Sequence, residues 1–195
     1  MSEHLDDAAL SQLFHTARSR NQWRKEALPD STWRQIYDLL KMGPTSVNTS
    51  PARFVFCTSE EAKARAAKHM SDTNAAKSVD APAIVIIAQD LEFAKKIPEL
   101  FPHNPDAQHW FSDEKLKQDT AFRNATLQGA YLMLAARALG LDCGPMSGFD
   151  NAALDADFFA GTQIRSNFLC AIGHGIDKSF DRLPRLKFED ACQIL

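Results

Sequence analysis

The chain has 195 residues, of which 45% are hydrophobic and 24% are charged, the composition of an ordinary globular protein. Its formal net charge is −3, so it has no overall basic field that would attract nucleic acid or an anionic membrane surface. No apolar run approaches the roughly 20 residues of a membrane-spanning helix. We therefore expect a single domain over residues 1–195, with no nucleic-acid partner and no membrane.

The N-terminal part of the chain predicts two helices. Apolar residues from 5 to 17 recur at helical spacing, and the basic stretch 18–21 breaks that pattern. The sequence Pro-Asp-Ser at 29–31 supplies N-cap chemistry for a second helix. This helix should stop near the Gly-Pro pair at 43–44, because glycine suits the end of a helix and proline cannot continue it.

The middle of the chain predicts two strands on either side of a helix. A polar loop over 44–53 leads into a short strand at 54–57, and a helix follows over 59–69. The run Ala-Ile-Val-Ile-Ile-Ala at 83–88 does not alternate with polar residues, which indicates a central strand buried on both faces. Residues 98–113 combine three prolines with aromatic side chains and predict an irregular segment.

The last third of the chain has the clearest helix, over 118–139, with a wide apolar surface. A loop over 141–150 follows it, and a short helix begins near Asn151. A third strand is predicted at 167–172, before a basic tail with a final amphipathic piece. Helices interleaved with a few short buried strands indicate α/β or α+β layers.

The four cysteines are widely spaced, and no two form a C-x-x-C pair of the kind that metal sites and redox motifs use. The N-terminus is acidic and lacks the basic start and the apolar stretch of a secretory signal. We therefore expect mostly buried free thiols in a reducing cytoplasm, and no metal site.

Five polar clusters lie at the edges of the apolar elements, and each has groups that can bind a small ligand. Arginines can grip a phosphate, an Asn and a Lys three residues apart can share a helical face, and glycines let the backbone approach a flat ligand. Each cluster taken alone is also explained by a solvated turn or a capping loop. No dinucleotide fingerprint, P-loop, G-x-S-x-G or H-E-x-x-H motif is present. The clusters lie at 18–21, 44–51, 74–77, 144–148 and 182–185.

In their order along the chain, these clusters resemble the FMN-dependent nitroreductase family. The stretch at 18–21 resembles the family's R-S-x-R region, and GPTSVNTSPARF resembles its P-S-S-x-N-x-Q-P-W-x-F signature. Asn74 and Lys77 resemble the Asn and Lys that face the polar edge of the isoalloxazine ring. LGLDCGPMSGFD resembles the loop near flavin N5, and Arg185 resembles a late phosphate-binding arginine. The resemblance covers essentially the whole chain.

The chain departs from the family pattern at two places. Ser50-Pro51-Ala52 stands where Gln-Pro-Trp is usual, which removes an amide and an indole from near the flavin. In the N-terminal cluster, Asn21 falls where a second basic residue is expected, and Arg20 is the candidate to replace it. The sequence leaves open which of residues 18–21 contact the phosphate and which contact the ring.

The resemblance implies an α+β fold with three layers, in which a central, mostly antiparallel sheet is flanked by helices. It also implies an intertwined homodimer with FMN at the interface, although the pattern at 118–139 equally suits a helix buried in a monomer. The implied cofactors are bound FMN and a co-substrate that is either NADH or NADPH. No nicotinamide motif in the sequence chooses between the two.

The resemblance also assigns roles. Flavin N5 carries the hydride, so no catalytic side chain is required, and the protein supplies orientation and electrostatics. Arg18 or Arg20 would bind the phosphate with Arg185, Lys77 would stabilise negative charge on reduced FMN, and Asn74 would fix the ring. The implied cofactor-binding residues are Arg18, Ser19, Arg20, Asn21, Pro44, Ser46, Asn48, Asn74, Lys77, Pro145, Met146, Ser147, Gly148, Arg182 and Arg185.

The finer resemblance is to the malonic semialdehyde reductase branch, which is associated with pyrimidine degradation. It implies reduction of a small 3-oxo acid to the 3-hydroxy acid, with Arg53 or Arg123 as a candidate anchor for the substrate carboxylate. Phe101, His103 and Trp110 are candidates to cover the substrate, or else belong to a packed surface loop. The alternatives are a broad-specificity nitroreductase or quinone reductase, a flavin-binding protein without turnover, and a structural protein without flavin.

Overall fold

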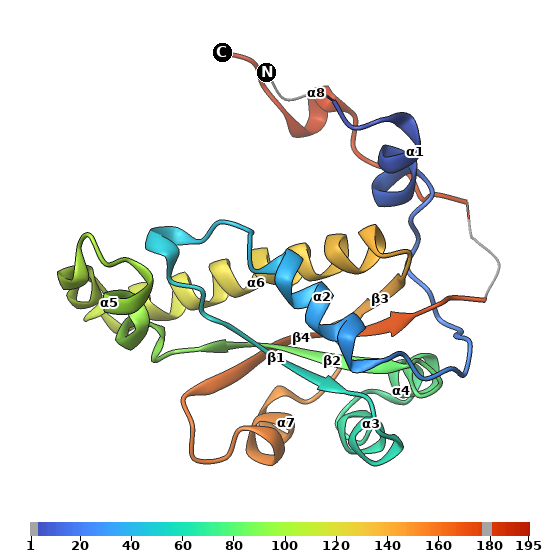
Figure 1. The fold of residues 1–195 in the computed structure, drawn as a ribbon, viewed down its shortest axis with the longest axis horizontal. Helices are drawn as coiled ribbons and strands as arrows, with labels where there is room; N and C mark the ends of the chain where they lie inside the picture. The colour runs from blue at the N-terminus through green and yellow to red at the C-terminus, as the bar shows by residue number, and fades with distance from the viewer. Residues whose placement is uncertain (1–3, 177–180) are drawn as a thin grey trace.

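Four strands form one antiparallel sheet at the centre of the molecule, in the order β1-β2-β4-β3. The computed structural model describes residues 4–176 and 181–195. Helices cover both faces of the sheet, so the predicted three-layer α+β fold is confirmed (Figure 1). The strands are β1 (Ala52–Cys57), β2 (Ala83–Asp90), β3 (Asp142–Met146) and β4 (Ile164–Gly173).

Strand β2 lies inside the sheet, and its apolar residues are buried on both faces, as the unbroken run at 83–88 predicts. Successive side chains of a strand point to opposite faces. Val85 and Ile87 pack into the core under the first helical layer, whereas Ile84 and Ile86 pack into the core under the second. All four side chains are fully buried, and each contributes about 1.5–3 kcal/mol of apolar transfer free energy.

Two helices, α2 (Asp30–Leu40) and α6 (Glu114–Ala138), form the first layer. Helix α2 buries Trp33, Ile36 and Leu40, which recur at helical spacing. Helix α6 begins where the Asp113 carboxylate accepts a hydrogen bond from the backbone N–H of Leu116 at 2.7 Å. It ends before Gly140, whose φ of +79° is in the left-handed region that favours glycine.

Three shorter helices form the second layer: α3 (Glu60–Ala67), α4 (Asp72–Ser78) and α7 (Asn151–Phe158). The Ser59 hydroxyl caps α3 by accepting from the backbone N–H of Ala62. The Asp150 carboxylate caps α7 in the same way, through the backbone N–H of Ala153. Helix α7 therefore begins at the predicted residue.

Several predicted boundaries are wrong. The strand β3 lies within 141–150, where the sequence predicts a loop. The Gly-Pro pair favours that prediction, since such a pair is unusual in a strand. Pro145 is tolerated here because β3 is an edge strand. Helix α6 begins four residues before 118, and β4 begins three residues before 167. Pro29 occupies the N-cap of α2 and makes no side-chain cap bond, so the expected capping chemistry at 29–31 is not present.

The segments expected to be irregular contain short helical pieces. Residues 98–113 include the end of a short α-helix and a 3-10 helix, each with a proline in its first turn, where no backbone donor is needed. The expected helix over 5–17 is a four-residue α-helix followed by a π-helical turn. These short elements are α1 (Asp7–Leu10), η1 (Ser11–His15), η2 (Ser46–Asn48), η3 (Phe93–Lys96), α5 (Ile97–Leu100), η4 (Pro105–Phe111) and α8 (Phe188–Ala191).

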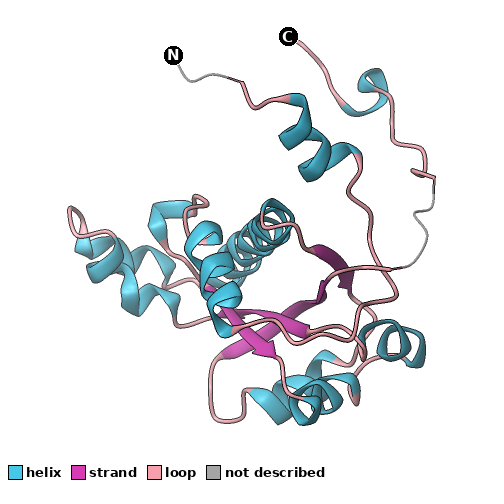
Figure 2. Cartoon of the chain, turned by 45° about the vertical axis from the view of Figure 1, so that its right-hand side comes forward, coloured by secondary structure: helices cyan, strands magenta, loops and turns pink. Residues whose placement is uncertain are grey.

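The N-terminal and C-terminal segments extend together away from the sheet and its two helical layers (Figure 2). Leu186 and Ile194 in the C-terminal segment are 75% and 85% exposed. The four cysteines are free thiols, three of them buried. Among the described residues, no helix combines the length and apolar character needed to cross a membrane.

Candidate functional site

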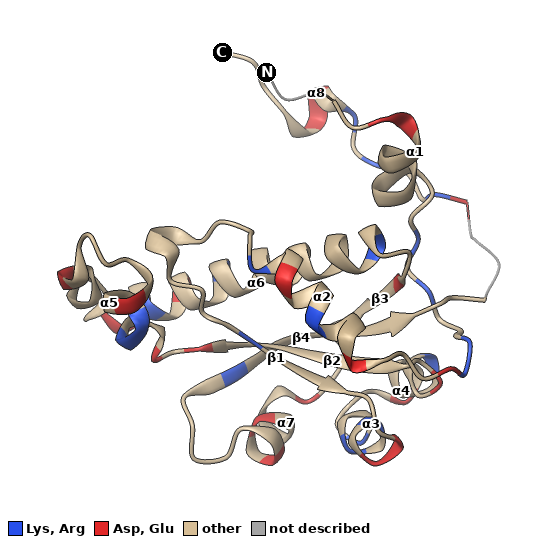
Figure 3. Ribbon diagram, in the orientation of Figure 1, with Lys and Arg blue, Asp and Glu red and all other residues tan. Residues whose placement is uncertain are grey.

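A cavity of about 430 Å³ lies between the N-terminal and C-terminal segments and brings together two of the predicted arginine clusters. Figure 3 shows basic residues on the chain between α1 and the sheet and on the segment that leads to α8. Four guanidinium groups line the cavity, and Asp181 is the one acidic residue among the described residues of its lining. The lining residues are Leu13, Phe14, Ala17, Arg18, Ser19, Arg137, Asp181, Arg182, Leu183 and Arg185.

Arg182 ties the C-terminal segment to the N-terminal one. Its guanidinium donates to the carbonyl oxygens of Phe14, His15 and Ala17 at 2.5, 3.0 and 3.1 Å. Arg18 donates to the carbonyls of His15 and Ala17 as well, so the two guanidiniums lie at the same turn of chain. Partial desolvation, followed by the positive charges of the neighbouring arginines, lowers the pKa of Arg182. A bound anion would relieve this repulsion.

Arg20 lies against the sheet and not in this cavity. Its Nε is 3.3 Å from Oδ1 of Asp142, and the Arg20 side chain is only 15% exposed. Its backbone N–H donates to the carbonyl of Cys143 at 3.1 Å. Of the cluster at 18–21, the structure therefore places Arg18 and Ser19 in the arginine-lined cavity and Arg20 in an ion pair at the edge of β3.

Trp23 joins three of the predicted clusters, a role that no pattern in the sequence indicates. Its indole Nε1 donates to the backbone carbonyl of Lys77, at the end of α4, at 2.7 Å. Its ring packs so closely on Gly144 that a Cβ there would lie 3.0 Å from it. The indole is 3% exposed. The segment 18–23, helix α4 and the edge strand β3 are thus held side by side.

Asn74 and Gly148 meet beyond the end of β3. The side-chain amide of Asn74 donates to the Gly148 carbonyl at 3.1 Å, and the Ser71 backbone N–H donates to the same oxygen at 3.0 Å. A Cβ on Gly148 would lie 2.7 Å from the Asn74 amide nitrogen, so a larger residue there would have to displace the Asn74 side chain from this contact. The Gly148 N–H makes no hydrogen bond within the part of the chain that the structure describes, which leaves a backbone donor for a ligand.

The loop with Pro44, Ser46 and Asn48 lies elsewhere, against the middle of α6. The Ser46 N–H donates to Oδ1 of Asn124 at 2.8 Å, and the Asn48 amide donates to the Leu100 carbonyl at 2.8 Å. Val47, Asn48 and Ser50 have φ values of 42°, 52° and 40°, in the left-handed region. For the β-branched Val47 in particular, such a backbone costs about 1–3 kcal/mol and is typical of functional sites.

The aromatic segment lies next to this loop. The rings of Phe101 and His103 are in contact, with centroids 3.8 Å apart and planes tilted by 56°, and Phe101 packs against the small core around Phe93 and Phe111. Trp110 is 54% exposed on η4. Through the bond from Asn48 to the Leu100 carbonyl, the structure brings the loop and the predicted substrate cover together.

Within one chain, the predicted site residues therefore lie in two separate groups. The arginine cavity includes Arg137, and the loop contacts Asn124, which lies 13 residues earlier on α6. At 1.5 Å per residue these positions are about 20 Å apart along the helix. Asn74 lies on α4, in the second helical layer, whereas the loop contacts α6 in the first (Figure 1).

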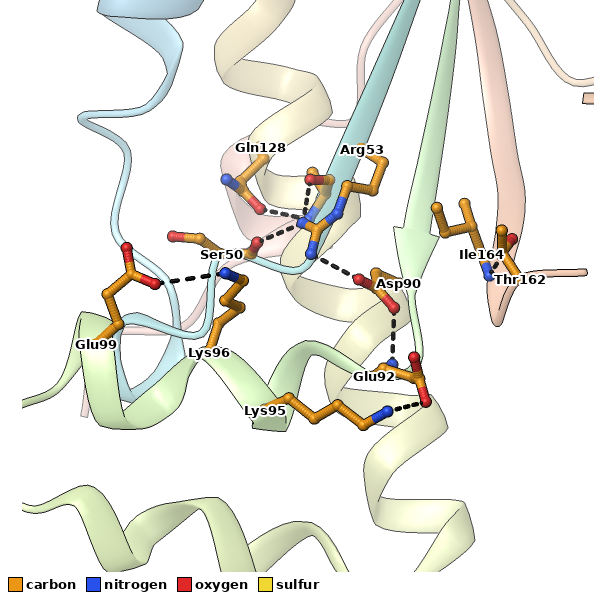
Figure 4. Close-up of polar contacts among 11 residues, drawn as sticks. Ser50, Arg53, Asp90, Glu92, Lys95, Lys96, Glu99, Gln128, Thr162 and Ile164 are labelled. Atoms are coloured by element: carbon orange, nitrogen blue, oxygen red, sulfur yellow. Dashed lines mark hydrogen bonds and ion pairs between the residues drawn. The ribbon is translucent and has the colours of Figure 1, made fainter. Parts of the chain in front are cut away.

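The two candidate carboxylate anchors differ in their surroundings. The Arg53 guanidinium lies 2.6 Å from Oδ2 of Asp90 and also donates to the Ser50 carbonyl, so its charge is already compensated (Figure 4). Arg123 lies on α6 in a groove of about 540 Å³, beside the exposed side chains of Phe122 and Leu127. Its side chain has no ion pair or hydrogen bond among the described residues.

Residues 15–175 match the sequence model of the nitroreductase family, which is most of the chain. The chain belongs to the nitroreductase family. Two relatives, from Caulobacter vibrioides and Stenotrophomonas maltophilia, are 58% and 55% identical to this nitroreductase, and each is provisionally named an NADH dehydrogenase/NAD(P)H nitroreductase. The first alignment covers 98% of both chains, and the second covers 100% of both.

Two solved structures share the fold of this nitroreductase at low sequence identity. A provisionally assigned nitroreductase from Bacillus subtilis superposes with a TM-score of 0.87 at 18% identity, covering 97% of this chain and all of the other. A second, from Exiguobacterium sibiricum and solved in complex with FMN, superposes at 0.86 and 20% identity over the full length of both. The chain is thus an oxidoreductase of the nitroreductase family with the family fold.

Proposed function

We propose that this nitroreductase binds FMN and uses NADH or NADPH to reduce a small organic substrate. The observation that carries the proposal is the cavity with four guanidiniums and one carboxylate, which suits the FMN phosphate. The close approach of Asn74 to Gly148 leaves a backbone N–H beyond β3, which suits the polar edge of a flat ring. Segment 18–23 joins these two places. The residues present therefore fit the cofactor.

The roles of the residues follow from this placement. Arg18, Ser19, Arg182 and Arg185 would hold the phosphate, and Arg20 would keep the segment against β3 through Asp142. Asn74 and the Gly148 N–H would orient the ring, and the Lys77 ammonium would favour negative charge at its edge. Bound FMN supplies the hydride chemistry, so the protein needs no nucleophile of its own.

We also propose that the protein is an intertwined homodimer. The loop with Pro44, Ser46 and Asn48 contacts α6 at Asn124, about 20 Å along the helix from Arg137 of the arginine cavity. A two-fold axis would bring the loop of one protomer to the cavity of its partner. The exposed apolar groove on α6, together with the exposed Leu186 and Ile194, offers apolar surface for that contact. The mostly buried free thiols fit a reducing cytoplasm.

For the substrate we propose a small 3-oxo acid such as malonic semialdehyde, as in pyrimidine degradation. Arg53 is compensated by Asp90, so Arg123 is the better anchor for a carboxylate. Phe101, His103 and Trp110 lie near the loop that would reach the partner's cofactor, where they could cover the substrate. A broad-specificity nitroreductase or quinone reductase is the second candidate, because the relatives carry nitroreductase names.

An absorption spectrum of the purified protein tests the proposal. We expect a yellow protein whose colour bleaches on addition of NADH or NADPH under anaerobic conditions, and returns when an acceptor is added. Comparing kcat/KM for malonic semialdehyde, a quinone and a nitroaromatic compound then identifies the acceptor class. A colourless protein that takes up no FMN would refute the cofactor, and a yellow protein that neither nicotinamide bleaches would be a flavin-binding protein without turnover.

A further inference from the structure

The fourth guanidinium of the arginine cavity comes from Arg137, in the last turn of α6. Nothing in the sequence marks this residue, because a basic residue near a helix C-terminus is ordinary and interacts favourably with the helix dipole. The structure places it with Arg18, Arg182 and Arg185 in the lining of the same cavity. The N-terminal segment, the end of α6 and the C-terminal segment thus each contribute positive charge to the lining of the arginine cavity.

Capping of α6 does not explain Arg137. The side-chain amide of Gln12 donates to the carbonyls of Arg137 and Ala138 at 2.7 and 3.3 Å. The carbonyls of Ala135 and Ala136 accept from the backbone N–H groups of Leu139 and Leu141, respectively. The last four carbonyls of the helix are therefore satisfied without a basic side chain.

The Arg137 guanidinium is also the least committed of the four. Arg18, Arg182 and Arg185 each donate to backbone carbonyls, which fixes their position but occupies some of their N–H groups. The side chain of Arg137 makes no hydrogen bond or ion pair with any residue that the structure describes. A half-buried guanidinium with its donors unused, beside three like charges, is placed to receive an anion.

We propose that Arg137 binds the phosphate of the flavin directly and makes the site selective for the phosphorylated cofactor over riboflavin. The inference rests on the proposed function, since it assumes that the cavity holds the FMN phosphate. Because Arg137 is carried by the 25-residue helix α6, it fixes the phosphate to the most extended element of the fold. The N-terminal and C-terminal arginines, by contrast, lie on segments that extend away from the sheet (Figure 2).

Titration of the apo-protein with FMN and with riboflavin tests this role. We expect Arg137→Gln to weaken FMN binding by about tenfold or more, the range for a hydrogen bond to a charged group, and riboflavin binding by less than twofold. Arg137→Lys, which keeps the charge but loses the planar pair of donors, should fall between Arg137→Gln and the wild type. Arg34→Gln, on α2 and outside the cavity, is the matched control and should bind both flavins as the wild type does.

Two results would overturn the proposal. In the first, Arg137→Gln keeps the wild-type affinity for FMN. In the second, it loses FMN and riboflavin equally, which would indicate a general structural defect. Failure of the wild-type protein to bind either flavin would instead refute the proposed function itself.

Discussion

Single residues in this protein are constrained by close contacts that composition does not reveal. A Cβ on Gly148 would displace the Asn74 amide nitrogen, which lies 2.7 Å from where that atom would be. Trp23 is buried, yet its indole N–H finds the Lys77 carbonyl, which avoids the cost of an unsatisfied polar group. In both cases one residue fixes the relative position of two segments that lie far apart in the sequence.

Asp157 on α7 is a further example, and its contacts predict a pH dependence. Its carboxylate accepts from Nε of Arg65 at 2.9 Å and lies 2.8 Å from Nε2 of His69. The hydrogen bond from Arg65, followed by that from His69, lowers the pKa of Asp157 from 3.8 to about 2. The contact between Asp157 and His69 lies close to the candidate site, because the backbone carbonyl of His69 accepts from the N–H of Asp150, just after Gly148.

The sign of the effect follows from the lowered pKa. The charged carboxylate stabilises the folded state above pH 4, and this contribution is lost as the pH falls from about 4 to about 2. We expect Asp157→Asn to be less stable than the wild type at pH 6, with the difference disappearing near pH 2. Urea midpoints across this range measure it, with the exposed Asp38→Asn as the control. A difference that stays constant down to pH 2 would contradict the assignment.

At the scale of elements, α6 organises the molecule. Its Asn124 and Gln128 side chains accept from the backbone of the 44–52 segment, and its last turn reaches the arginine cavity. Its buried face meets the sheet at Gly129, where a Cβ would lie 2.5 Å from the Phe168 ring and 3.3 Å from Ile87. The close approach of α6 to the sheet, rather than helix propensity, therefore explains why residue 129 is a glycine.

The substitution Gly129→Ala therefore tests whether the cost of overpacking the helix–sheet contact exceeds the gain from the higher helix propensity of alanine. Alanine would gain about 1 kcal/mol in an exposed helix interior, whereas overpacking a core costs about 1–3 kcal/mol. We expect a net loss of stability in urea or thermal denaturation. The double variant Gly129→Ala, Phe168→Leu, which removes the ring in the way, should recover part of the loss. A single variant more stable than the wild type would show that the sheet moves to make room.

At the scale of the whole molecule, the residues of the proposed site fall into two separate groups within one chain. The arginine cavity and the strained loop lie about 20 Å apart along α6, and apolar side chains of the C-terminal segment remain exposed. In the proposed homodimer, association of two copies would bury these side chains and would bring the two groups of proposed site residues together. The proposed dimer is thus a condition of the proposed cofactor site.

Deletion of residues 188–195 tests the dimer while keeping Arg182 and Arg185. We expect a weaker dimer, a larger monomer fraction at micromolar concentration, and lower FMN retention on dialysis. Sedimentation velocity and flavin absorbance measure the two effects. Val79→Ser, which removes an exposed apolar side chain from another surface, is the control. A truncated protein that stays fully dimeric, or a full-length protein that is monomeric, would contradict the proposal.

The sequence by itself determined the family and most of the helices and strands, and the resemblance to that family implied the three-layer α+β fold. These depend on local patterns, such as the apolar run of β2, the hydroxyl cap of α3 and the order of five polar clusters. Local patterns also explain the misplaced elements: the Gly-Pro pair hides β3, and prolines hide the helical turns within 98–113.

Only the tertiary structure decided which of these clusters lie together. It separated Arg20 from Arg18, paired Arg53 with Asp90, and added Trp23 and Arg137 to the candidate site. None of these outcomes follows from sequence spacing, because each depends on contacts between segments that are distant along the chain. The charge compensation and the close packing that give these residues their roles exist only once the sheet and α6 have brought those segments together.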